Sequence, residues 1–203
     1  MTDYFALLEE ARRPWLDTDS LKHKFLARSA EVHPDRVHGA DPATKTIAQQ
    51  RYAELNAAYL CLREPRDRLR HLLELELGRK PGELQEMPPE LADLFMQIVP
   101  VLREADGFLT RYAVITSPLL RAQSFGEVQQ FTERLTARQH SLKEHHDQLL
   151  RRLEELDRTW CERTADLGLR TDLLPELENI CRRLGFFSRW NGQLQERLLR
   201  LML

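Results

Sequence analysis

The chain has 203 residues, of which 42% are hydrophobic, enough for one large or two small domains with a buried core. A formal net charge of -2, with 31% charged residues, argues against a generally basic nucleic-acid-binding protein. Apolar runs fall short of the roughly twenty residues that span a bilayer, and Asp3, Glu9 and Glu10 do not resemble a secretory leader. We therefore expect a cytoplasmic protein that binds neither nucleic acid nor membrane.

The chain is predicted to be all-α, because β-branched residues are few and strict apolar/polar alternation over more than four residues is essentially absent. In residues 19–32 the apolar Leu21, Phe25 and Val32 share one helical face. The helix is expected to end near residue 33, since Pro34 disfavours helical dihedrals in the residue before it.

A second helix is predicted after the turn residues Gly39, Asp41 and Pro42. Its apolar stripe, spaced to pack against the first helix, consists of Tyr52, Leu55, Ala58, Tyr59 and Leu62. Two antiparallel helices would then present the loop at their tip, where binding residues tend to lie.

That loop reads His33-Pro34-Asp35, and at these residues the chain resembles the J-domain family, whose signature is a helical hairpin with His-Pro-Asp in its connection. Tyr4-Phe5-Ala6-Leu7-Leu8 is similar to the opening of the first J-domain helix, and Leu55-Asn56-Ala57-Ala58-Tyr59 to the third. The match covers Met1 to about Gly78 and implies a hairpin plus two shorter helices.

The resemblance implies a non-enzymatic co-chaperone that stimulates the ATPase of a heat shock protein 70 (Hsp70) chaperone. On the family pattern, the chaperone-binding residues are His33, Pro34, Asp35, Lys24 and Arg28, with Lys22 or Arg36 as rim contacts. Without the adjoining loop, the three helical cations would be ordinary solubilising charges.

A domain boundary is predicted where turn residues gather between Gly78 and Pro89, which gives domains at 1–78 and 90–203 joined by a linker at 79–89. In the second domain the apolar face from Leu91 to Leu102 is interrupted by Pro100, which should kink or divide the helix. Residues 115–126 are interpreted as a connector.

From Glu127 to about Thr164 no proline or glycine occurs, which predicts one long helix. Its heptad seam is Val128, Leu135, Leu142, Leu149 and Leu156, typical of an antiparallel bundle or coiled coil. With a last helix over residues 173–203, the C-terminal half is predicted to be a three-helix antiparallel bundle.

This order of parts, together with Leu62-Arg63-Glu64-Pro65-Arg66-Asp67-Arg68 and the following Leu72-Leu73-Glu74-Leu75, resembles the iron–sulfur co-chaperones of the HscB (Hsc20) family. That family binds an iron–sulfur scaffold protein through the first bundle helix. The matching positions here are Leu94, Phe95, Met96 and Val99. Phe95 and Met96 can equally be read as core residues, since apolar side chains at helical spacing normally face inward. Pro100 stands where the family has an acid.

No metal site or cofactor is predicted. The cysteines Cys61, Cys161 and Cys181 are far apart and are interpreted as buried structural thiols. His145 and His146 diverge on a helix, so they do not easily share a metal with His140.

Two alternatives stay open at the level of the sequence. The chain could be a helical scaffold or adaptor with an inactive J-like half, or a co-chaperone for a different client.

Overall fold

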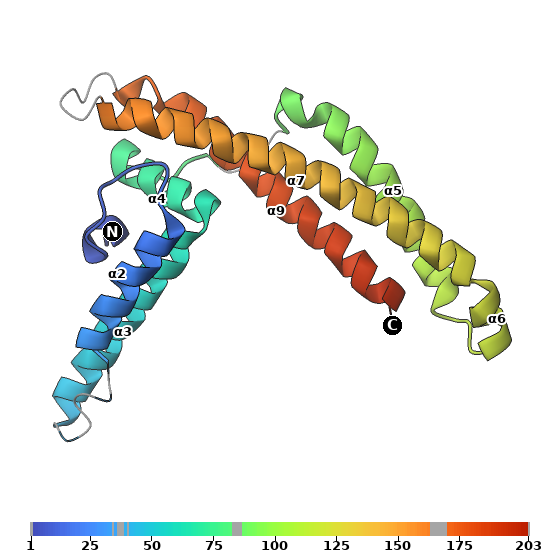
Figure 1. Cartoon of the computed structure of the whole chain (residues 1–203), viewed down its shortest axis with the longest axis horizontal. Coiled ribbons are helices and arrows are strands. Elements are labelled where there is room, and N and C mark those ends of the chain that lie inside the picture. Colours follow the sequence, from blue (N-terminus) through green and yellow to red (C-terminus); the bar gives the residue numbers. More distant parts are fainter. Residues whose placement is uncertain are drawn as a thin grey trace. The chain divides into compact units, whose positions relative to one another are not determined.

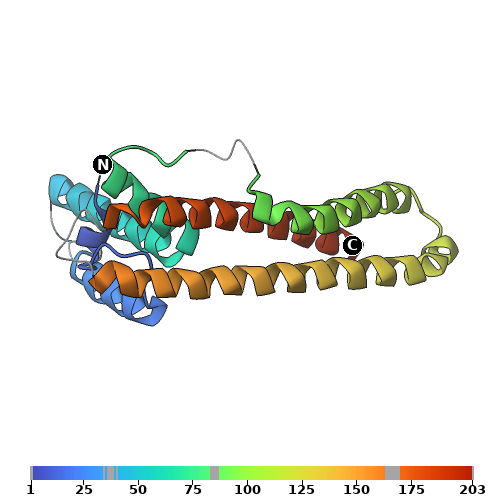
Figure 2. The same cartoon turned by 90° about the horizontal axis from the view of Figure 1, so that it is seen from above.

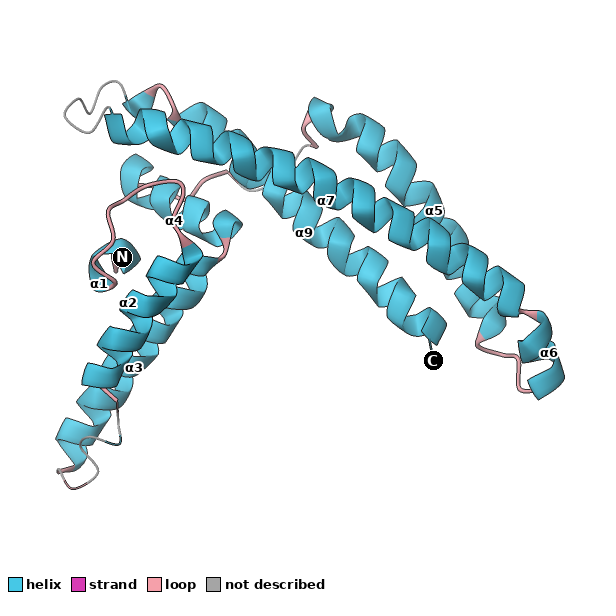
Figure 3. Ribbon diagram, viewed as in Figure 1, coloured by secondary structure: helices cyan, strands magenta, loops and turns pink. Residues whose placement is uncertain are grey.

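The computed structural model describes residues 2–33, 35, 39, 41–82, 87–162 and 170–202. Within these residues every regular element is a helix and none is a strand (Figure 3), which confirms the all-α prediction. In chain order they are α1 (Tyr4–Leu7), α2 (Thr18–Glu31), α3 (Pro42–Arg63), α4 (Pro65–Leu77), the 3₁₀ turn η2 (Pro89–Leu91), α5 (Ala92–Tyr112), α6 (Pro118–Gln123), α7 (Phe125–Glu162) and α9 (Leu174–Met202). Pro34 and Arg36 lie outside the described residues.

By its internal contacts the chain divides into two compact units. Unit 1 contains Met1–Gly82 and Arg151–Cys181, and unit 2 contains Glu83–Leu150 and Arg182–Leu203. The end of α7 and the start of α9 thus group with the N-terminal segment. The domain boundaries at 78 and 90 stay a prediction. The grouping shows in addition that a C-terminal segment, Arg151–Cys181, packs with the N-terminal segment in unit 1.

The predicted hairpin is present in unit 1, where α2 and α3 lie side by side (Figure 1). Each helix begins at an aspartate that accepts backbone N–H groups: Asp17 caps α2 through Ser20, and Asp41 caps α3 through Ala43 and Thr44. The hydrogen bond from the Thr44 hydroxyl lowers the pKa of Asp41, so this cap is charged over a wide pH range. The two aspartates therefore set where α2 and α3 begin, and the cap at Asp41 marks the end of the connection between them.

An aromatic stack joins the two helices of the hairpin. The rings of Phe25 and Tyr59 are stacked with their centroids 4.4 Å apart, while Leu21, Leu55, Ala58 and Leu62 are buried beside them. The predicted stripes thus meet in the core of unit 1.

Helix α4 begins at Pro65 and ends at Gly78, whose left-handed φ of 65° suits a residue without a side chain. Two of its buried residues are polar. Arg68 donates from Nε to the Pro14 carbonyl (2.9 Å) and from Nη1 to the Leu62 carbonyl (2.7 Å). His71 accepts the Tyr4 backbone N–H at Nε2 (3.0 Å), which holds α1 against α4.

The seam of α7 is buried as predicted at Leu135, Leu142, Leu149 and Leu156. Within unit 2, α5, α7 and α9 run alongside one another in both views (Figures 1 and 2). The apolar face of α9 is buried at Leu184, Phe187, Leu194, Leu198 and Leu201.

Two sequence expectations need correction and one is narrowed. Of the two outcomes expected at Pro100, a kink or a division, the division does not occur, since α5 continues from Ala92 to Tyr112 with Pro100 inside it. The supposed connector contains the short helix α6, and its Gly126 lies inside α7. Cys161 is exposed rather than buried, because it lies outside the seam of α7. Among the described residues, no helix is both long and apolar enough to cross a membrane.

Candidate functional site

The candidate site starts at the tip of the hairpin, just after α2 ends at Glu31. The side chain of Asp35 is 90% exposed and that of His33 is 44% exposed. The Asp35 backbone N–H donates to Nδ1 of His33 (3.3 Å), and the Asp35 carboxylate lies 3.5 Å from the same nitrogen. With Nδ1 accepting this bond, the neutral ring carries its proton on Nε2, which can donate to a partner.

The imidazole is held from the side of α3. Its ring meets the Tyr52 ring edge-on, with the centroids 5.3 Å apart. An aromatic residue of the predicted stripe therefore orients the histidine, while the carboxylate of Asp35 faces solvent.

Two of the predicted chaperone-contact cations already have partners inside the chain. Nζ of Lys24 lies 2.9 Å from the Glu10 carboxylate and donates to the Glu9 carbonyl (3.1 Å). Nη1 of Arg28 donates to the Glu9 carboxylate (2.8 Å). Both cations thus face the loop between α1 and α2.

Lys22 lies on the other side of α2. It is exposed and forms no ion pair with any residue that the structure describes. The neighbouring Leu26 is 51% exposed, an apolar residue on the open side of α2 that the sequence reasoning did not single out. Its signal was weak, because one leucine outside the Leu21–Phe25 stripe is common on a protein surface.

The predicted client-binding residues of α5 differ in their exposure. Met96 is 69% exposed, whereas Phe95 and Val99 are half-buried, and the Phe95 ring faces the Trp190 ring of α9 (6.4 Å between centroids). Leu94 is only 4% exposed and packs in the core of unit 2, so it offers far less surface to a partner than Met96 does. Beside Met96, Gln97 accepts a hydrogen bond from Arg138 of α7 (2.8 Å).

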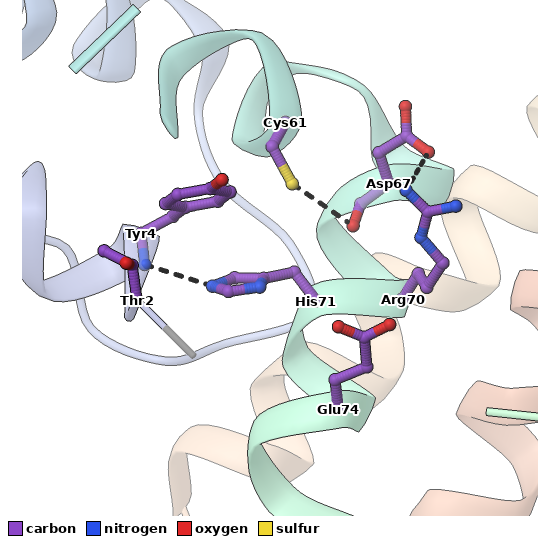
Figure 4. A pocket seen from close by; sticks show the side chains of 7 residues that line it. All are labelled: Thr2, Tyr4, Cys61, Asp67, Arg70, His71 and Glu74. Atoms are coloured by element: carbon purple, nitrogen blue, oxygen red, sulfur yellow. Dashed lines mark hydrogen bonds and ion pairs between the residues drawn. The ribbon is translucent and has the colours of Figure 1, made fainter. Parts of the chain in front are cut away.

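A pocket lies elsewhere in unit 1, between α1, α3 and α4 (Figure 4). Its lining residues are Thr2, Tyr4, Cys61, Asp67, Arg70, His71 and Glu74. Burial raises the pKa of the Cys61 thiol to about 11, so it is protonated at neutral pH and is a poor nucleophile. Since the Cys61 thiol also donates to the Asp67 carbonyl (3.5 Å), these groups serve to pack α1, α3 and α4 together.

No group of three or more metal-ligating side chains converges within the described ranges. His140 and His146 of α7 pair with carboxylates of their own helix, Glu144 (3.5 Å) and Asp147 (3.6 Å), respectively. The three histidines do not come together as a site.

No family model matches the chain. Among curated proteins, it is 40% identical over 72 residues to the "Co-chaperone protein HscB homolog" of Bordetella petrii, covering 36% of this chain and 42% of the relative. It is 36% identical over 95 residues to the protein of the same description from Paraburkholderia phytofirmans, covering 47% of this chain and 54% of the relative. The matches thus span about half the length of these relatives.

Among solved structures, human co-chaperone protein HscB aligns over 96% of this chain and 81% of its own, with a TM-score of 0.58 and 19% identity. The chaperone HscB from Vibrio cholerae aligns over 96% of both chains, with a TM-score of 0.53 and 20% identity. These two likenesses establish the fold. The chain is therefore similar in sequence to HscB co-chaperones and has the fold of HscB structures: a J-domain followed by a helical bundle.

Proposed function

We propose that this chain is a J-domain co-chaperone that binds an Hsp70 chaperone of the DnaK or HscA type, stimulates its ATPase and delivers an iron–sulfur scaffold protein. The observation that carries the proposal is the exposed Asp35 carboxylate beside an oriented His33. The similarity to proteins described as HscB co-chaperones supports the same role. The chain itself would catalyse nothing.

The chemistry of the tip suits a brief, polar contact. Asp35 offers a carboxylate to a cation of the chaperone, and His33 can donate from Nε2. Lys22, and Arg36 on the sequence resemblance, would add contacts with acidic groups. Such charge pairs mainly raise the association rate and orient the partner, so stimulation is expected to weaken as salt is added.

The test is steady-state ATPase stimulation of a purified HscA-type chaperone by the full chain. His33→Gln and Asp35→Asn should each raise the half-maximal concentration by about tenfold or more, the scale of losing a central polar contact. His140→Gln, the same substitution at an exposed histidine of α7, is the matched control and should behave as wild type.

Absence of stimulation by wild type, or equal stimulation by His33→Gln, would contradict the co-chaperone role and favour an adaptor with an inactive J-like half. The client is tested separately. Met96→Asp should weaken binding of an iron–sulfur scaffold protein, because it places a charge in the exposed apolar patch formed by Met96, Phe95 and Val99.

Met202→Asp is the control for the client test, since Met202 is similarly exposed, at 74%, but lies at the end of α9. Equal binding by Met96→Asp, Met202→Asp and wild type, measured by titration calorimetry, would instead point to a different client or a different surface.

A further inference from the structure

The loop at residues 9–15 contacts the chaperone-facing helix on one side. Glu9 pairs with Arg28 at 2.8 Å and Glu10 pairs with Lys24 at 2.9 Å. An acidic surface of a partner must displace these two carboxylates before it can pair with either cation. The loop is therefore placed to reduce the positive potential of α2.

The backbone conformation of Glu9 is intrinsically unfavourable. Its φ of 52° lies in the left-handed region, and Glu9 is the one described residue other than glycine with a positive φ. A side chain is disfavoured there, so contacts elsewhere must hold the loop. One of them is next to it, where the Glu10 N–H donates to the Phe5 carbonyl (2.8 Å).

The stronger contacts lie on the other side of the loop, at the C-terminal end of α7. The Asp157 carboxylate accepts from Nε of Arg13 (3.0 and 3.1 Å to its two oxygens), from Nη2 of Arg13, and from the backbone N–H of Trp15 (3.1 Å). Trp160 donates its indole N–H to the Arg12 carbonyl (2.9 Å). Asp157 and Trp160 are 1% and 0% exposed, so their ends of these bonds are shielded from water, whereas the Arg13 side chain is 35% exposed.

All of these residues belong to unit 1, and the loop runs directly between the two sets of contacts. Asp157 and Trp160 hold positions 12–15 through part-buried hydrogen bonds, which are charge-assisted at Arg13 and come from the indole at Trp160. Three residues earlier, the same loop presents Glu9 and Glu10 to α2. Only a short stretch of chain thus separates the residues that Asp157 holds from the two that meet the cations.

We infer that Asp157 and Trp160 are positioning residues that keep Glu9 and Glu10 on Lys24 and Arg28, and thereby lower the affinity of α2 for the chaperone. This inference rests on the proposed function and adds to it an internal acidic competitor for the chaperone. Loosening the competitor should strengthen binding, a direction opposite to the effect of structural damage.

The first test removes the competitor without disturbing its anchor. The full chain with Glu9→Gln/Glu10→Gln should show a half-maximal concentration for ATPase stimulation of the HscA-type chaperone that is lower by roughly threefold to tenfold at low ionic strength. The difference should shrink at high salt, and the maximal stimulation should not change. Glu54→Gln/Glu127→Gln, which removes two exposed carboxylates from α3 and α7, is the matched control for net charge.

The second test removes the anchor. Asp157→Asn should lower the half-maximal concentration in the same direction and should add little to the Glu9→Gln/Glu10→Gln variant when combined with it. Asp106→Asn is its control, because Asp106 of α5 makes a similar two-oxygen pair with Arg197 (3.0 and 2.9 Å) in unit 2. That control should match wild type.

An unchanged or higher half-maximal concentration for Glu9→Gln/Glu10→Gln overturns the inference, whatever Asp157→Asn does. The proposed function still stands in that case, provided that wild type stimulates the chaperone and His33→Gln abolishes the stimulation. If wild type does not stimulate the chaperone, both fall together.

Discussion

The two units bury different kinds of side chain. All four buried polar residues in the described part of the chain, Ser29, Arg68, His71 and Asp157, belong to unit 1. The buried side chains of unit 2 are aliphatic or aromatic within the same ranges, as along the α7 seam at Leu135 and Leu142. Hydrogen bonds and ion pairs of buried polar groups therefore help to set the geometry of unit 1.

Directed bonds and apolar packing specify different things. A buried guanidinium or carboxylate must meet its partners at hydrogen-bond distance, so it fixes where a particular loop lies. An apolar seam requires burial and matching volume, and tolerates exchange among residues of similar size. Unit 1, which carries the 9–15 loop and the hairpin tip, is accordingly expected to be the more sensitive to single polar substitutions.

The largest loss of stability is expected at Arg68, which joins Pro14 to Leu62 through hydrogen bonds to their carbonyls. Burial lowers the pKa of Arg68 to about 10, so it is still charged at neutral pH. Arg68→Met leaves two buried carbonyls without donors, and the free energy of unfolding, measured with urea, should fall by about 4 kcal/mol. Arg70→Met, at an exposed arginine of the same helix, should cost less than about 0.5 kcal/mol. Similar losses of unfolding free energy for the two variants would mean that the hydrogen bonds of Arg68 to Pro14 and Leu62 do not stabilise unit 1.

The next largest effect tests the apolar packing of unit 2. Leu135→Ala removes a fully buried seam residue and should lower the free energy of unfolding by about 3 kcal/mol. Leu135→Met conserves the volume and should cost less than about 1.5 kcal/mol. If methionine were as damaging as alanine, packing in unit 2 would have to be as specific as the polar contacts of unit 1.

The smallest expected effect is the loss of stability at low pH that comes from the hydrogen bond between α1 and His71. Burial lowers the pKa of His71 below its ordinary 6.5, and the neutral ring accepts the Tyr4 N–H. The unfolded chain then binds the proton more readily than the folded chain, so this stabilisation is complete above pH 6.5 and is lost as the pH falls through 6.5 toward the folded pKa.

Losing the Tyr4 bond costs about 1 kcal/mol, which sets the scale of this acid effect. Urea unfolding at pH 7.5 and 5.5 should show a larger loss for wild type than for His71→Gln. The same pH dependence in both proteins would show that His71 does not titrate with folding.

Much of the fold was predictable because it depends on local patterns. Asp41 begins α3 as expected, α2 ends at Glu31 close to the expected residue, and the heptad leucines of α7 mark a buried seam. The placement of His33 after the end of α2 followed from the same rules. The burial of Leu94 could not be predicted in the same way, because helical spacing shows which residues share a face, not how much of that face a neighbouring helix covers.

Local patterns along the chain were thus enough to predict the helices, their apolar faces and the loop that carries the His-Pro-Asp motif, since each follows from backbone preferences and spacing within a few turns. Folding in three dimensions was needed to bring Lys24 and Arg28 to Glu10 and Glu9, and to place Asp157 against Arg13 across 144 positions of the chain. Charge pairs and buried hydrogen bonds depend on distance in space, and no periodic pattern along the chain encodes which distant side chain will supply the partner.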